Sequence, residues 1–272
     1  MDTAPDLIDL DRYPITNPVS GVTRALIAEQ RRSLAHKGVA ILPGFVKPDV
    51  IAAMARQGDA LKERAHLEDV WGSPYLELPD ESYPTGHPRR ANVHSLTWVI
   101  AYDLIPKGTL ARLLYEWDPL MHFIGEILER RPLYRMADPM GALNVTLMDA
   151  DHVQGWHYDN ADFVVSLAIR SSRAGGTFEC APLIRSAADE HYDEVAAVLR
   201  DEAPERVEIF PMTPGTLMIF AGRNSVHRVS PVQGDISRQV ALFAYDTRPD
   251  ADSTALFKML RYGRSEPLAQ SL

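Results

Sequence analysis

The sequence predicts a mainly β protein with α-helices, in which a jelly-roll core over about residues 136–250 follows a mostly helical flank over about residues 1–135. Two observations support this prediction. The first half contains long segments with apolar residues at helical spacing, and after residue 140 the pattern changes to short β-rich runs separated by turn-forming residues. Because no repeat, linker or low-complexity tract divides the chain, we expect residues 1–272 to form a single domain.

The flank is predicted to contain two pairs of helices, the first pair separated by the strand VAILPGF (39–45). Gly38 stands where the first helix would stop, and Asp118-Pro119 separates the second pair. Residues 71–95 contain four prolines and many turn formers, so we expect an ordered loop there that covers another part of the molecule. The predicted helices cover residues 23–38, 47–67, 108–117 and 119–131.

The core is predicted from seven β-rich runs, a number typical of an antiparallel sandwich or barrel of the jelly-roll type. One helical insert interrupts them at residues 186–203, where Val195, Val198 and Leu199 have helical spacing and the opposite face is acidic. The runs are GALNVTLMD (141–149), DFVVSLAIRS (162–171), GTFECAPLI (176–184), RVEIFPM (206–212), GTLMIFAG (215–222), SVHRVSPV (225–232) and RQVALFAYDT (238–247).

Composition excludes several classes of partner. The formal net charge of −9 argues against nucleic-acid binding, which usually needs a basic face. The N-terminus is acidic and rich in proline, unlike a signal peptide, and no apolar stretch approaches the roughly 18 residues needed to span a membrane. Cys180 is the only cysteine, which suits a reducing compartment. We therefore expect a soluble cytoplasmic protein, monomeric or homodimeric, whose partner is a small molecule.

The tripeptide His-Tyr-Asp occurs twice, at 157–159 and at 191–193. On a strand, residues i and i+2 point to the same side, so a His and an Asp spaced in this way can hold one metal ion. On a helix the same two side chains diverge by about 200°. The second copy lies in the predicted helical insert, whereas the first lies just before the run at 162–171. Only the first copy is therefore expected to chelate.

Non-haem iron(II) oxygenases bind their metal through two histidines and one carboxylate. His157 and Asp159 supply two such ligands, and the third must be a distant histidine on a neighbouring strand. His227, 68 residues after Asp159, lies in the run SVHRVSPV. The other histidines fall on predicted helices, in the proline-rich loop or in a turn, so His227 is the best candidate for the third ligand.

Arg238 follows His227 by eleven residues and strengthens this interpretation. The Gly234-Asp235 turn between the two last runs predicts a hairpin, in which alternation places His227 and Arg238 on the same inward face. An arginine inside an apolar barrel is costly unless it meets an anion. A small dicarboxylic cosubstrate would supply a carboxylate for a bidentate pair.

The set of His157, Asp159, His227 and Arg238 resembles the iron(II)/2-oxoglutarate-dependent oxygenase superfamily, which has a double-stranded β-helix core. The block GWHYDN (155–160) followed by HRVSPV (227–232) looks like the branch that contains radical halogenases and hydroxylases of free amino acids, and the resemblance spans about residues 35–250. It implies that the triad binds Fe(2+), that Arg238 pairs with the distal carboxylate of 2-oxoglutarate, and that O2 is the second cosubstrate.

The resemblance also bears on the reaction. In the halogenases of this branch a small residue replaces the carboxylate ligand and leaves a coordination site for chloride. This chain keeps Asp159, so hydroxylation of a C–H bond, with release of succinate and CO2, is the implied outcome. The expected substrate is small and polar, with a free amino acid or a derivative favoured. The alternatives are desaturation, epoxidation or ring formation at the same site, a protein substrate, or a non-catalytic jelly-roll module.

Two further residues are candidates for contacts near the metal. Asn144 belongs to an alternating polar set in ALNVTLMD and is a candidate ligand of the cosubstrate or substrate; a place on the polar face of the sheet is the alternative. Trp156 directly precedes the first ligand and is a candidate wall of the site, with ordinary packing as the alternative.

The proline-rich loop supplies the remaining candidates. Its prolines limit the entropy cost of ordering, so the loop is a candidate lid over the substrate. The resemblance implies a substrate contact for Arg89, since the branch tends to have an HPR-like stretch here, and a surface role is the alternative for each candidate. The residues that could bind a substrate carboxylate are Arg89, Arg90 and His94.

Overall fold

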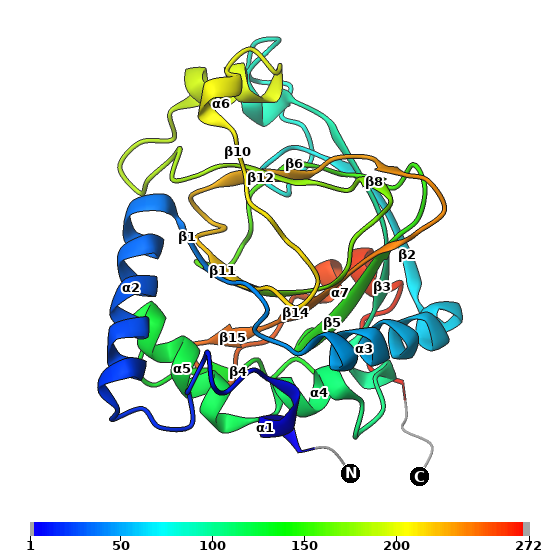
Figure 1. Ribbon diagram of the computed structural model, residues 1–272. Helices are drawn as coiled ribbons and strands as arrows, with labels where there is room; N and C mark the ends of the chain where they lie inside the picture. Colours follow the sequence, from blue (N-terminus) through cyan, green and yellow to red (C-terminus); the bar gives the residue numbers. More distant parts are fainter. Residues whose placement is uncertain (1–2, 269–272) are drawn as a thin grey trace.

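The computed structural model describes residues 3–268, and its centre is an antiparallel sheet of eleven strands that curls into a barrel (Figure 1). The strand order is β1-β11-β7-β14-β5-β3-β6-β12-β9-β10, with β2 paired to β3 outside this path. The strands of this sheet are β1 (Val39–Leu42), β2 (His66–Gly72), β3 (Val93–Ile100), β5 (Leu143–Met148), β6 (Gln154–His157), β7 (Val164–Arg170), β9 (Phe178–Ala181), β10 (Glu208–Ile209), β11 (Leu217–Phe220), β12 (Val226–Val229) and β14 (Arg238–Phe243). The predicted jelly-roll core is confirmed.

Two short pairs complete the β-structure, and helices surround the barrel. The short pairs join β13 (Val232–Gln233) to β8 (Ala174–Gly175) and β15 (Tyr245–Asp246) to β4 (Tyr134–Arg135). The α-helices are α1 (Ala4–Leu7), α2 (Gly21–Lys37), α3 (Pro48–Leu61), α4 (Leu110–Tyr115), α5 (Asp118–Leu128), α6 (Tyr192–Leu199) and α7 (Ala255–Tyr262). None of the helices in residues 3–268 is long and apolar enough to cross a membrane.

The ends of α2 illustrate how local sequence sets these elements. Ser20 caps its first turn, because the Ser20 hydroxyl accepts a hydrogen bond of 3.0 Å from the backbone N–H of Thr23. Gly38 ends the helix in the left-handed conformation with φ +68°, where an L-residue with a side chain would be strained. The chain then turns directly into β1, as the sequence predicted.

Alternation along β5 divides the molecule into an outer core and a barrel interior. One face of β5 packs against the helices that lie outside the sheet in Figure 1, and each fully buried leucine there contributes roughly 1.5–3 kcal/mol to folding. The other face points into the barrel. The outward set is Leu143, Val145 and Leu147, and the inward set is Asn144, Thr146 and Met148.

The prediction for residues 47–100 is wrong in part. The helix predicted over 47–67 ends at Leu61, and residues 66–72 and 93–100 form the β2–β3 hairpin instead of helix and loop. Only residues 73–92 connect these strands outside the sheet. The reason lies in the tertiary structure, because β3 pairs with β5, which lies far along the chain. Local periodicity in the sequence cannot reveal such a pairing.

The predicted hairpin between the last two runs is also wrong. β12 pairs with β6 and β9, whereas β14 pairs with β5 and β7, so the two strands are not neighbours. Between them the chain passes through β13, which pairs with β8, and crosses from one wall of the barrel to the other. The helical insert is shorter than predicted, since α6 covers Tyr192–Leu199.

We propose that residues 1–272 act as one domain. The sheet supports this proposal, because β2 and β3 from the supposed flank are built into the same sheet as the strands of the core.

Candidate metal centre

The first His-Tyr-Asp copy lies at the end of β6, a strand that the seven predicted runs did not include. β6 pairs with β12 so that His157 stands opposite His227, and the two ring centroids are 4.2 Å apart. Asp159 follows β6, and its backbone N–H donates to the carbonyl of Gly222 at 3.2 Å. One ligand atom from each of the three side chains lies within 4.8 Å of the others. The structure therefore brings the three predicted ligands together.

Backbone carbonyls orient both imidazole rings. His157 Nδ1–H donates to the carbonyl of Gly155 at 2.7 Å, and His227 Nδ1–H donates to the carbonyl of Ser225 at 2.9 Å. A carbonyl only accepts hydrogen bonds, so the proton of each neutral ring is fixed at Nδ1. The lone pair of each Nε2 is then free to bind a metal ion, and His227 Nε2 lies 3.5 Å from Asp159 Oδ2.

The site is a good match for a divalent cation. Burial lowers the pKa of His157 to about 4, assisted by the nearby His227, and burial likewise lowers the pKa of His227 to about 4. Burial raises the pKa of Asp159, and its buried Oδ2 accepts no hydrogen bond from residues 3–268. A buried carboxylate oxygen without a hydrogen bond, next to two neutral imidazoles, suits a metal site of the two-histidine, one-carboxylate type.

Acidification is expected to destabilise the metal-free protein as the pH falls from about 6.5 to about 4. The unfolded histidines gain protons below their ordinary pKa of 6.5, whereas buried His157 and His227 resist protonation until about pH 4. The unfolded state therefore binds more protons, and each ligand histidine costs about 2 kcal/mol of unfolding free energy at pH 5. Urea unfolding of EDTA-treated protein at pH 7 and pH 5 measures the loss. The loss of unfolding free energy between pH 7 and pH 5 should be smaller in His227→Asn than in the wild-type protein. In His191→Asn it should equal the wild-type loss. An equal loss in all three proteins would contradict the assignment.

Gly222 positions the carboxylate ligand and was not singled out from the sequence. A Cβ added at Gly222 would overlap Asp159 Oδ2 and would lie 2.8 Å from Asp159 Cγ and 2.9 Å from its Cβ. Only a residue without a side chain lets the carboxylate approach this closely. One sequence without relatives does not distinguish such a glycine from the other fifteen.

We expect Gly222→Ala to weaken iron(II) binding about 10- to 100-fold, because the new methyl group must push Asp159 away from the histidines. Anaerobic iron(II) titration measures the change. Gly21→Ala is the matched control, since a Cβ there meets nothing within 4 Å. Equal affinities of the two variants would show that Gly222 does not position the ligand.

Arg238 is buried in the barrel interior, 8% exposed, at the start of β14. Its Nη1 lies 3.9 Å from Met148 Sδ, and no carboxylate among residues 3–268 forms an ion pair with it. Burial alone lowers the pKa of Arg238 to about 10. His227 is 4% exposed, so both side chains are buried as predicted, although the strands that carry them do not form a hairpin. An unpaired interior guanidinium is suited to an anionic ligand.

Asn144 and Trp156 have partners other than the three ligands. Asn144 lies on the inward face of β5, where its Nδ2 donates to the carbonyls of Met140 and Leu143 and its Oδ1 accepts from the hydroxyl of Tyr262. The side chain of Trp156 packs in a cluster with residues of α6, and the Arg228 guanidinium lies 4.5 Å from its ring. Alternation along β6 thus directs Trp156 away from the face that holds His157.

The structure does not bring the loop candidates to the triad. Arg89 donates to the Tyr192 hydroxyl at 2.9 Å and lies 4.4 Å above the ring of Tyr75, so it fastens the segment 73–92 to α6. Figure 1 shows this segment next to α6 above the barrel. Arg90 donates to the carbonyl of Tyr83 at 3.1 Å. His94 stacks on Trp71 and bonds to Asp69 at 2.8 Å. A lid role for these residues stays a prediction.

The second His-Tyr-Asp copy stands at the start of α6, and it does not belong to a group of possible metal ligands within residues 3–268. His191 precedes the first residue of the helix with φ +49°, Tyr192 contacts Arg89, and Asp193 lies in the first turn. His191 Nδ1 lies 3.8 Å from carboxylate oxygens of Asp189 and Glu194. The sequence predicted that all three residues lie within the helix, whereas the structure places His191 just before its first residue.

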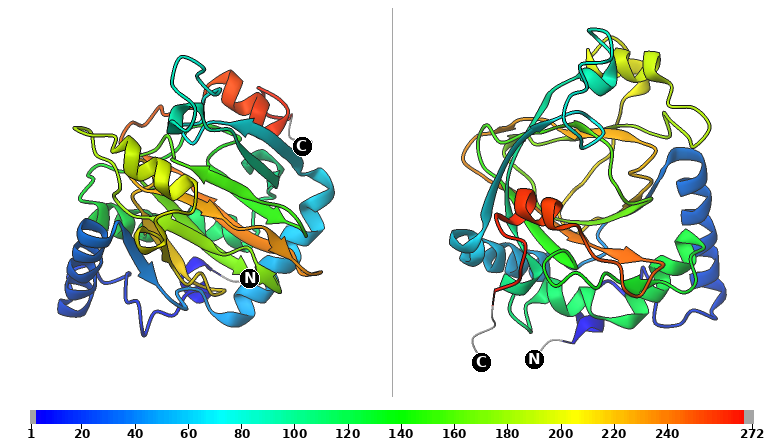
Figure 2. Two further views of the ribbon diagram at one scale, coloured as in Figure 1. Left: turned by 90° about the horizontal axis from the view of Figure 1, so that it is seen from above. Right: turned by 180° about the vertical axis from the view of Figure 1, so that it is seen from behind.

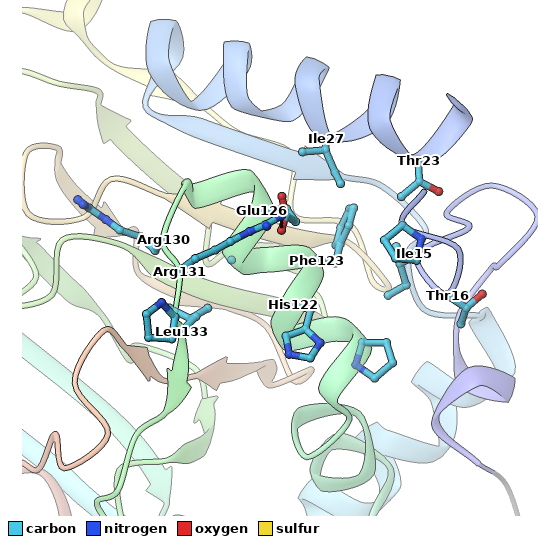
Figure 3. A pocket seen from close by; sticks show the side chains of 14 residues that line it. Ile15, Thr16, Thr23, Ile27, His122, Phe123, Glu126, Arg130, Arg131 and Leu133 are labelled. Carbon is cyan, nitrogen blue, oxygen red and sulfur yellow. Dashed lines mark ion pairs between the residues drawn. The ribbon is translucent and has the colours of Figure 1, made fainter. Parts of the chain in front are cut away.

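A separate cavity of about 580 Å³ lies between α2 and α5 (Figure 3). Ile27 of α2 and His122, Phe123 and Glu126 of α5 point into it, next to Arg131. None of the residues that line it belongs to the metal triad or contacts Arg238. We place the chemistry at the triad because the cavity combines no comparable set of metal ligands.

Several solved structures that are named as 2-oxoglutarate-dependent enzymes have a similar fold. A 2OG-Fe(II) oxygenase family oxidoreductase from Burkholderia pseudomallei has a TM-score of 0.51 at 18% identity, over 83% of this chain and 92% of the other. The epimerase SnoN from nogalamycin biosynthesis has a TM-score of 0.54 at 14% identity, over 82% and 83%. The carbocyclase SnoK from the same biosynthesis has a TM-score of 0.54 at 13% identity, over 89% and 93%. The chain thus shares the fold of these oxygenases.

The family model described as Halogenase D matches residues 22–259. The chain therefore belongs to the Halogenase D family, and the resemblance found in the sequence is confirmed. No curated protein matches the sequence.

Proposed function

We propose that this protein is an iron(II)/2-oxoglutarate-dependent oxygenase that hydroxylates a C–H bond of a small polar substrate, a free amino acid or a derivative. The observation that carries the proposal is the position of Asp159. Its carboxylate faces His157 and His227 within metal-binding distance, so the full two-histidine, one-carboxylate set is present although the family is named for halogenation. With Asp159 as a ligand, the coordination site that chloride would need is taken.

The proposed roles follow from the geometry. His157, Asp159 and His227 hold Fe(2+), the two Nδ1–H···O=C bonds keep the imidazoles turned toward it, and Arg238 pairs with the distal carboxylate of 2-oxoglutarate. When bound, iron with 2-oxoglutarate and O2 supplies the oxidising power for C–H cleavage and yields succinate and CO2. The barrel wall around Arg238 excludes water from this chemistry.

Succinate formation against a panel of free amino acids and small metabolites tests the proposal, with mass measurement of any product in the presence of chloride. A product heavier by one oxygen supports hydroxylation. Loss of two hydrogens would replace hydroxylation by desaturation or ring formation, and incorporation of chlorine would refute the role given to Asp159. The triple variant lacking His157, Asp159 and His227 is the blank.

A further inference from the structure

The pairing of β6 with β12 contains an irregularity directly beside the two ligand histidines. From the pair of His157 and His227 to the next pair of residues, β12 advances by two positions and β6 by three. β6 therefore contains a β-bulge, in which Gly155 and Trp156 together stand opposite Arg228. A bulge interrupts the hydrogen bonds of the ladder and redirects the side chains next to it, and this bulge ends at a metal ligand.

The bulge carries the backbone group that orients His157. The carbonyl of Gly155 accepts the 2.7 Å hydrogen bond from His157 Nδ1–H, so a displacement of Gly155 would turn the imidazole. β3 lies against the bulge, because a Cβ added at Gly155 would be 2.7 Å from the carbonyl oxygen of His94 and 2.9 Å from the Cβ of Val93. The bulge cannot shift toward β3, so a restraint in the opposite direction has to come from β12 or from the outer face of the sheet.

Arg228 supplies such a restraint on the outer face. Its guanidinium lies 4.5 Å from the centroid of the Trp156 ring, where the electrons of an aromatic face attract a cation. Its Nε donates to Glu179 Oε2 at 2.7 Å, and its Nη1 lies 3.1 Å from Asp201 Oδ1. Glu179 belongs to β9, the neighbour of β12 on the side away from β6. The guanidinium thus joins three adjacent strands across the bulge.

The contact with Arg228 gives the Trp156 ring its direction. Trp156 is 4% exposed, and its indole N–H donates no hydrogen bond within residues 3–268. The ring packs in an apolar cluster with Val195 and Val198 of α6. Figure 1 shows α6 above β6 and β12, and Figure 2 (left) shows the helix from above, in front of the sheet. Apolar packing is non-directional, so it buries the indole without fixing its orientation.

The C-terminal helix makes its contacts on the other face of the wall. α7 closes the end of the barrel that faces away from the viewer in Figure 1, and Figure 2 (right) shows it in red from that side. It packs on β2 and β3, and the Nη1 of Arg261 donates to Oε2 of Glu68 in β2. Glu68 stands opposite Thr97 on the interior face. This contact therefore lies on the face opposite to Trp156 and Arg228.

We infer that Arg228 is a positioning residue for the metal centre and that it acts through Trp156. Its guanidinium holds the bulge of β6 in place and thereby keeps the imidazole of His157 turned toward that of His227. This inference rests on the proposed function, because it assigns residues outside the barrel that support the proposed iron site. Neither Arg228 nor Trp156 is a metal ligand.

Anaerobic iron(II) titration of the full chain in excess 2-oxoglutarate tests this role. Arg228→Met keeps an unbranched side chain beside the indole but removes the charge, and we expect it to weaken iron(II) binding about 10-fold. Arg228→Lys keeps a cation and should recover most of the affinity. Trp156→Leu should cause the same loss as Arg228→Met. The double variant should bind iron(II) no more weakly than either single variant, because both changes remove one interaction.

A measurement without metal separates positioning from general stability. In the metal-free protein, NMR follows the exchange of the His157 Nδ1 proton with water, which should be faster in Arg228→Met because the bond to Gly155 is less constrained. Val198→Ala removes buried methyl groups from the cluster around Trp156. It should lower the melting temperature but leave iron(II) affinity and proton exchange at their wild-type values.

Three results would overturn the inference: wild-type affinity in Arg228→Met, additive losses in the double variant, or an equal loss of affinity in Val198→Ala. A wild-type protein that binds no iron(II) would instead refute the proposed function. The exchange of the His157 proton needs no metal and would still decide whether Arg228 positions the imidazole.

Discussion

Replacing His227 with alanine is expected to abolish the visible charge-transfer band that iron(II) and 2-oxoglutarate form anaerobically with the protein, and His157→Ala should do the same. Each variant leaves two of three ligands, and the group of possible ligands within residues 3–268 contains no fourth side chain that could substitute. Loss of one ligand of a three-ligand site removes most of its affinity for the metal. Titration with iron(II) in excess 2-oxoglutarate measures the band directly.

The second His-Tyr-Asp copy provides a matched control within the same chain. His191→Ala and Asp193→Ala remove the same two residue types from the start of α6. Neither residue belongs to the group of possible metal ligands within residues 3–268. Both variants should keep the band and the turnover of the wild-type protein. A normal band in His157→Ala and His227→Ala would refute the site assignment.

Arg238→Met is expected to change two measurements in opposite directions. The affinity for 2-oxoglutarate should fall by about 100-fold, because the distal carboxylate loses its charged partner. The ligand-free protein should become more stable by about 1–3 kcal/mol, because the variant removes a buried cation that has no carboxylate partner within residues 3–268. A residue that merely supported the fold would give a loss of stability instead.

Thermal unfolding with increasing 2-oxoglutarate measures both effects at once. The wild-type melting temperature should rise with the cosubstrate, and that of Arg238→Met should start higher and rise little. Arg248→Met is the control, since the Arg248 side chain is 70% exposed and pairs with Asp246. An equal response of wild type and Arg238→Met to 2-oxoglutarate would contradict the role of Arg238.

The sequence was sufficient to place the ligands because their spacing carries geometric information. Both tripeptides have the i, i+2 spacing, and the helix predicted around the second copy distinguished them. The β-rich run around His227 predicted a strand. The prediction that Arg238 is buried rested on a hairpin that the structure does not contain. The burial was right because alternation holds along any strand of the wall, whichever neighbour it pairs with.

The parts that could not be predicted depend on contacts between distant segments. Glu68 fell just past a supposed helix, and only its place opposite Thr97 reveals that it faces the interior. Gly222 matters because Asp159 folds back onto it from 63 residues earlier. Arg89, Arg90 and His94 looked like anion ligands by residue type, but the structure gives them partners on α6, in their own loop and on β2.

The contact between Glu68 and Arg261 links positions 193 residues apart, so it also bears on the order in which the molecule is completed. During synthesis the ribosome releases the metal ligands and Arg238 before it releases α7. A nascent chain can therefore assemble a barrel with one end open, and contacts of such long sequence separation form last. An iron ion bound at that stage would be poorly shielded from solvent. The barrel is closed around the site only when α7 docks.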